Sequence, residues 1–149
     1  MNQEQKDNAS ERDDATLFKT LAEARERLFD LMRLLWRYDQ VKTSDSGCDL
    51  RRGKDFFREV PVWSFEAYVE ADLVNGENIC WWLDLTWNSS TWVVDANVSV
   101  TQGDVLIKFP DRSSGEVLKA CEDVKAAVQD LLATVERVPR LGQKKVIAR

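Results

Sequence analysis

Apolar residues recur at helical spacing in the first part of the chain. From Ala15 to about Asp39 they stand three or four positions apart with charged residues between them, a pattern typical of an amphipathic helix. These apolar residues are Leu17, Leu21, Leu28, Leu31, Met32, Leu35 and Trp36, and we expect all of them, Trp36 included, to join the core. Residues 1–14 are almost entirely polar and predict a disordered leader.

The period changes to two after Pro61, and such alternation of apolar and polar residues is typical of half-buried strands. Four runs follow one another, at Trp63–Leu73, Ile79–Trp87, Trp92–Thr101 and Val105–Phe109. One register makes their apolar sides agree, with a three-residue loop that holds Gly76 in the left-handed conformation and a two-residue Gln102-Gly103 turn. The opposed pairs are then Trp63 with Trp87, Val69 with Trp81, Trp87 with Trp92, Val98 with Ile107, and Val100 with Val105.

The segments around these strands are interpreted from turn and cap residues. Residues 40–60 contain TSDSG and RRGK and predict a long connection, in which DFFREV has room for one helical turn. Ser113–Glu116 has the form of a capping box before a second helix that ends near Glu136. Its apolar positions are Val117, Cys121, Val124, Val128, Leu131 and Val135.

Together these elements predict the fold class. We expect an α+β protein with a helix, a four-stranded antiparallel meander and a second helix, both helices covering one face of the sheet. Residues 15–136 form the single domain, and residues 137–149 form a flexible tail with five basic residues and no acidic one.

The register sorts the tryptophans of "ICWWLDLTWNSSTWVV" between the two sides of the sheet. Trp63, Trp81, Trp87 and Trp92 face the helices, whereas Trp82 lies on the other side. The residues expected beside Trp82 are the opposed Tyr68 and the acidic Glu66, Glu70, Asp72, Asp84 and Asp95. Glu66 faces Asp84, and Asp84 faces Asp95, so three carboxylates form a row. Each such like-charge pair costs about 0.2 to 1 kcal/mol.

Charge is concentrated on the sheet. The 149 residues carry a net charge of −5, but residues 61–111 contain eight acidic residues and one lysine, a net charge of −7. A field of this sign repels phosphate backbones and attracts basic proteins, so we expect a basic protein partner and no nucleic acid.

Composition excludes several kinds of chemistry. The chain has no histidine, which excludes Ser-His and Cys-His nucleophile activation and histidine-ligated metals. Cys48, Cys80 and Cys121 form no C-x-x-C, so neither a disulfide framework nor a zinc site is indicated, and a reducing cytoplasm fits best. No apolar run approaches the length that spans a bilayer. We expect a soluble cytoplasmic protein with no cofactor and no membrane contact.

Three interpretations of the acidic side remain open. Charges on one side of a sheet serve solubility. Trp82 and Tyr68 are residue types enriched at binding hot spots, so the same side also suits a non-enzymatic protein-binding module. A third possibility is a metal site or an acid-base pair built on Glu66, Asp84 and Asp95. If residues 40–60 cover Trp82, the ring belongs instead to a second small core.

The small acidic chain and its meander "WWLDLTWNSSTW" between helices resemble tryptophan-rich α+β bacterial immunity proteins, which neutralise cognate toxins. The resemblance covers residues 15–136 as an architecture and implies that an acidic surface blocks a basic toxin. Small acidic α+β chaperones of bacterial secretion systems are a similar alternative, with an effector as the partner. The partner's identity and the oligomeric state stay open.

Overall fold

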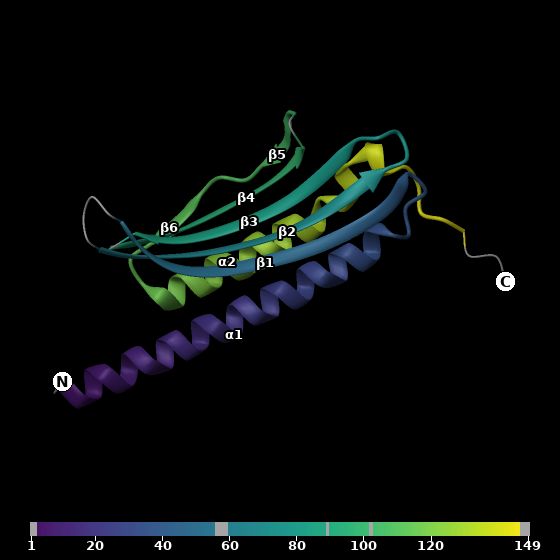
Figure 1. The fold of residues 1–149 in the computed structure, drawn as a ribbon. Helices are drawn as coiled ribbons and strands as arrows, with labels where there is room; N and C mark the ends of the chain where they lie inside the picture. Colours follow the sequence, from purple (N-terminus) through teal and green to yellow (C-terminus); the bar gives the residue numbers. More distant parts are fainter. Residues whose placement is uncertain (1–2, 56–59, 89, 102, 147–149) are drawn as a thin grey trace.

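The computed structural model describes residues 3–55, 60–88, 90–101 and 103–146. They form an α+β fold in which two helices contact one antiparallel sheet (Figure 1). The elements are α1 (Gln3–Leu35), β1 (Val41–Asp55), β2 (Val60–Leu73), β3 (Asn78–Asn88), β4 (Thr91–Val100), β5 (Val105–Lys108), β6 (Arg112–Ser114) and α2 (Val117–Ala133). Two 3-10 helices follow, η1 (Val135–Arg137) and η2 (Pro139–Leu141).

The sheet is a meander in the order β1-β2-β3-β4-β5, and β6 also pairs with β4. The predicted register of β2, β3 and β4 is confirmed, including Val69 opposite Trp81 and Trp87 opposite Trp92. At β5 the prediction is right for Val98 and Ile107 but wrong for Val105, which lies opposite Ser99 after a register shift. The sheet also has two strands, β1 and β6, that the sequence pattern did not reveal.

The prediction of a long connection at residues 40–60 is wrong, because residues 41–55 form β1, which pairs with β2 along its whole length. Beyond Val41, β1 lies at the edge of the sheet, and its described side chains from 42 to 51 are exposed or half-buried. An edge strand needs no alternation of apolar and polar residues, so the period-two signal is missing. The helical turn suggested for DFFREV falls mainly on residues 56–59, outside the described part.

The hairpin between β2 and β3 confirms the predicted three-residue loop. Gly76 has a φ of 91°, in the left-handed region that favours glycine. The Leu73 N–H donates to the Glu77 carbonyl at 2.8 Å, and the Gly76 N–H donates to the Leu73 carbonyl at 3.0 Å. This loop sets the register that separates Trp81 from Trp82.

The buried residues of β2, β3 and β4 all come from one side of the sheet and share a core with the buried residues of both helices. We call this side the covered face. Trp81 lies at its centre with 0 % of its surface exposed. Its indole Nε1–H donates to the Thr134 hydroxyl at 2.9 Å, and that hydroxyl donates to the Leu131 carbonyl at 2.7 Å. The polar atom of this fully buried tryptophan therefore has its hydrogen-bond partner.

The other tryptophans on the predicted apolar side differ in burial. Trp87 and Trp92 are half-buried, with ring centroids 4.8 Å apart. Trp36 is 54 % exposed, so its predicted place in the core is wrong. The helix ends at Leu35, and the turn that follows carries Trp36 off the apolar stripe. The side chain of Trp63 lies outside the described part of the chain.

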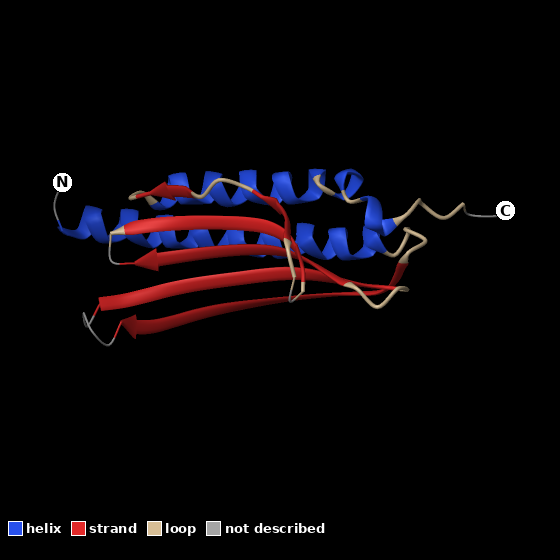
Figure 2. Ribbon diagram, turned by 90° about the horizontal axis from the view of Figure 1, so that it is seen from above, coloured by secondary structure: helices blue, strands red, loops and turns tan. Residues whose placement is uncertain are grey.

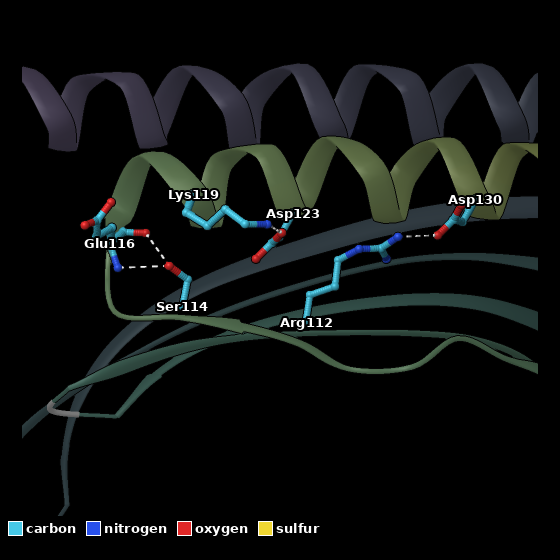
Figure 3. A network of polar contacts seen from close by, with 6 residues as sticks. All are labelled: Arg112, Ser114, Glu116, Lys119, Asp123 and Asp130. Carbon is cyan, nitrogen blue, oxygen red and sulfur yellow. Dashed lines mark hydrogen bonds and ion pairs between the residues drawn. The ribbon is translucent and has the colours of Figure 1, made fainter.

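Polar contacts connect β6 to α2 (Figure 3). Arg112 of β6 forms an ion pair with Asp130 at 3.0 Å, and Lys119 pairs within α2 with the buried Asp123. The predicted capping box does not form, because Ser113 belongs to β6 and Glu116 itself is the N-cap residue. Ser114 instead accepts a hydrogen bond from the Glu116 N–H at 3.0 Å.

At both ends of the described chain the structure has features that the pattern did not predict. The backbone of α1 is helical from Gln3, within the segment expected to be a disordered leader. In the predicted flexible tail, Val138 and Leu141 are buried. The Lys145 N–H donates to the Arg37 carbonyl at 2.6 Å, so the chain pairs with the turn after α1 as far as residue 145.

Candidate protein-binding face

We call the side of the sheet opposite the covered face the open face. At its centre, Tyr68 of β2 lies opposite Trp82 of β3 as predicted, and we call the row of opposed residues through this pair the aromatic row. The row continues through Asn97 to Lys108. Tyr68 and Trp82 are both half-buried, so Trp82 keeps part of its surface accessible on the predicted side.

Residues 41–55 do not cover Trp82 but widen the open face. In Figure 2, β1 lies at the outer margin of the sheet beside β2. Gly47 of β1 is opposite Tyr68, and a β-carbon at Gly47 would lie 2.6 Å from the Tyr68 hydroxyl oxygen. The tyrosine ring therefore lies over the backbone of β1, in space that only a glycine leaves free. Trp82 is not part of a second core made by this segment.

A row of carboxylates runs beside the aromatic row. The three predicted members, Glu66, Asp84 and Asp95, are opposed in register, and Asp49 of β1 adds a fourth opposite Glu66. We call these four residues the carboxylate row. Because residues 41–55 do not alternate between apolar and polar, the sequence pattern could not place Asp49 there.

The other predicted acidic residues lie on the far side of the aromatic row. Glu70 stands between Asp45 of β1 and Cys80 of β3. Asp72 lies near the end of β2, where it accepts hydrogen bonds from the Thr43 hydroxyl at 3.1 Å and the Asn78 amide at 2.7 Å. Neutral donors thus already satisfy Asp72, which sets it apart from the carboxylate row.

The middle of the carboxylate row is electrostatically strained. Burial raises the pKa of Asp84 above its ordinary value of 3.8, and the charges of Glu66 and Asp95 raise it further, against a hydrogen bond from Thr86. Burial also raises the pKa of Asp95, with a further contribution from the adjacent Asp111.

Two oxygen atoms in this row have no hydrogen-bond partner. They are Oδ1 of Asp84 and Oδ1 of Asp95, both inaccessible to solvent although their residues are only half-buried. A buried polar atom without a partner costs about 1 to 3 kcal/mol. Folding alone therefore gains nothing from this pair of atoms.

Other chemistry on this face is limited. Burial, followed by the charge of Glu70, raises the pKa of Cys80 to about 11, so its thiol is protonated at neutral pH. Within the described residues, no group of three or more cysteine, aspartate and glutamate side chains is placed to hold a metal ion. No helix in the described ranges is both long and apolar enough to cross a membrane.

Comparisons of the chain with protein-family models, with curated proteins and with solved structures found no match. The candidate site therefore rests on the geometry and charge of the open face.

Proposed function

We propose that this chain is a non-enzymatic protein-binding module, an immunity protein that neutralises a basic toxin through its open face. The observation that carries the proposal is the strained centre of the carboxylate row, next to an accessible aromatic pair. Asp84 and Asp95 each keep one inaccessible oxygen without a hydrogen bond, directly beside Trp82 and Asn97.

A basic partner would relieve the like-charge repulsion in the row by binding the exposed parts of its carboxylates, although the two inaccessible oxygens lie out of its reach. Neighbouring strands lie about 4.8 Å apart, so four opposed carboxylates span about 14 Å. Arginine presents five donors in a rigid fork and binds carboxylates through paired, charge-assisted hydrogen bonds. Arg51 already pairs with Asp49 at the β1 end of the row, so two or three arginine or lysine side chains on one partner surface would match the carboxylates from Glu66 to Asp95.

The aromatic pair supplies apolar contact area, which the carboxylates alone do not offer to a partner. Tryptophan and tyrosine are enriched at interface positions that dominate affinity, and a cation over an indole gains about 0.5 to 2 kcal/mol. Trp82 has acidic residues on both flanks, so a basic side chain held by Asp84 also comes close to the ring. The net charge of −7 over residues 61–111 would speed the encounter with a basic partner.

The test is a binding measurement with a purified partner. The gene beside this one is the first place to look for the toxin, and its product can be co-expressed and titrated by calorimetry. We expect Trp82→Ala and Asp84→Asn each to weaken binding at least tenfold, and added salt to weaken it in the wild type. Asp104→Asn is the matched control, because Asp104 is an exposed carboxylate outside the open-face rows.

The result that would overturn the proposal is equally specific. If the toxin binds Trp82→Ala and Asp84→Asn as tightly as the wild type, the open face is not its site. If the neighbouring gene encodes a secreted effector instead, and its product binds with the same sensitivity to Trp82 and Asp84, the face is a binding site but the immunity role is wrong.

A further inference from the structure

One edge of the sheet is a long free strand. β1 ends the strand order and pairs with β2, and its register is regular from Thr43 to Asp55 after an irregularity at Val41. The other edge is shared by the short strands β5 and β6, with Pro110 between them. On the covered face β1 contacts α1, where the Ser44 hydroxyl donates to the Met32 carbonyl at 2.8 Å, but no described strand pairs with its outer edge. A strand edge of this kind exposes backbone N–H and C=O groups that pair readily with another chain.

We propose that a second copy of this chain pairs antiparallel with β1 about a two-fold axis at Cys48, which joins the two sheets into one. In that arrangement Asp45 lies opposite Arg51 of the partner subunit, and the symmetric pair forms on the other side of the axis. Arg51 also pairs with Asp49 of its own chain, so each arginine would lie between two carboxylates. Both side chains are exposed and belong to the open face, since Asp45 is opposite Glu70 and Arg51 is opposite Ser64.

Charge selects this register over its neighbours. A two-fold axis pairs residues that lie at equal distances on either side of it. Each possible register is therefore defined by the residue that lies on the axis and faces its own copy. Centring on Gly47 opposes Asp45 with Asp49, and centring on Asp49 opposes that residue with itself. Like charges directly opposite are destabilising. Centring on Ser46 avoids them but forms no pair of opposite charges, whereas centring on Cys48 sets Asp45 against Arg51 on both sides of the axis and opposes like charges only at the strand ends, Lys42 with Lys54.

On the open face, the partner would bring a carboxylate beside Tyr68. With the axis at Cys48, Asp49 of the partner subunit lies opposite Gly47. The Tyr68 ring lies over Gly47, with its hydroxyl 2.6 Å from where a β-carbon would be. Opposed β-carbons are about 4.5 to 5.5 Å apart, so this hydroxyl is within reach of the partner's Asp49 carboxylate.

On its other side, β1 borders a groove against α1. The cavity has a volume of about 600 Å³, and its walls include Phe29 of α1 and Ser46 and Cys48 of β1. Phe29 is 37 % exposed and Leu50 is 44 % exposed. In the proposed pairing, Leu50 of the partner subunit lies opposite Ser46, at the mouth of this groove beside Phe29. Pairing would therefore shield an exposed apolar side chain on each copy.

The test is the mass of the protein in solution as a function of concentration, by sedimentation or light scattering. We expect the wild type to form dimers at high micromolar concentration. Asp45→Arg alone and Arg51→Asp alone should each weaken the dimer at least tenfold, because each places like charges opposite one another. An equimolar mixture of the two variants should regain dimers, since every Arg then faces an Asp.

Controls separate this pairing from unfolding and from other contacts. Circular dichroism checks that each variant folds, and Asp104→Arg reverses an exposed charge away from β1 and should dimerise like the wild type. A short bis-maleimide should join two chains through the exposed Cys48 in the wild type and lose this product in Asp45→Arg. A wild type that stays monomeric at several hundred micromolar overturns the proposal, and so does a dimer that both single variants retain.

This inference is independent of the proposed function, because the assay contains no toxin. Pairing through β1 leaves the open face accessible and places two copies of it side by side. A monomeric protein that still binds a toxin through Trp82 would refute the dimer alone.

Discussion

The covered face and the open face of the same sheet obey different physical rules. On the covered face, Trp81 is fully buried and its N–H is hydrogen-bonded to Thr134. On the open face, one residue further along β3, Trp82 remains partly exposed beside carboxylates whose pKa values are raised. Among the described residues, no buried side-chain polar atom on the covered face lacks a hydrogen-bond partner, whereas the open face retains unfavourable charge. The comparison shows where stability is built and where another molecule is expected to bind.

The neighbouring tryptophans give the largest expected contrast. Trp81→Ala should lower the free energy of unfolding by about 3 to 5 kcal/mol, because it opens a cavity in the core. Trp82→Ala should cost less, about 1 to 2 kcal/mol, because part of the ring remains exposed and its truncation opens no closed cavity. Urea denaturation of the two variants measures both values. Equal losses would mean that Trp82 supports the fold as Trp81 does, and the comparison of the two faces would fail.

A hydroxyl on each face gives the next largest contrast. Thr134→Val should cost about 1 to 3 kcal/mol, since the indole N–H of Trp81 would be left buried without an acceptor. Thr43→Val, which removes the hydrogen bond to Asp72 on the exposed side, should cost less than about 0.5 kcal/mol. Thermal unfolding of the two variants under the same conditions provides the comparison.

Asp84→Asn should change the free energy of unfolding in the opposite direction and stabilise the protein. Removing the charge between Glu66 and Asp95 should raise the free energy of unfolding at pH 7 by about 1 kcal/mol. Because folding raises the pKa of Asp84, the folded state binds that proton more tightly than the unfolded state does. The stability from this protonation is present at low pH and is lost as pH rises through the raised pKa.

The variant's advantage over the wild type should therefore shrink as pH falls from 7 to about 4. Denaturant unfolding of both proteins at several pH values measures this trend. Asp104→Asn should behave like the wild type throughout. An Asp84→Asn protein that is less stable than the wild type at neutral pH would show that this carboxylate supports the fold.

The smallest effect is spectroscopic. With 5-fluorotryptophan in the chain, the fluorine resonances report how far each ring is reached by solvent. The solvent-isotope shift should be largest for Trp36, which is 54 % exposed, intermediate for Trp82 and absent for Trp81. Single Trp→Phe variants assign the resonances. A shift for Trp82 as small as that of Trp81 would place the ring in a closed core.

The part of the candidate site that could be predicted follows from the alternation of apolar and polar residues and from the glycine in one turn. Alternation placed Tyr68 and Trp82 on one side, and the glycine at position 76 set their register. The fourth carboxylate, Asp49, could not be found this way. Its strand lies at the sheet edge, where neither face demands apolar residues, and its serines, aspartates and glycines are typical of turns.

By itself the sequence determined which residues of β2, β3 and β4 face the core, because a strand with one buried side must alternate and a slip of one residue would bury its charges. It also determined that negative charge gathers on the other side. Tertiary structure alone decided that residues 41–55 extend the sheet, that Trp36 leaves the core and that the chain beyond Arg137 packs against the turn after α1. These outcomes depend on contacts between segments far apart in the chain. Such contacts impose no regular spacing of apolar residues on the local sequence, so no periodic pattern reveals them.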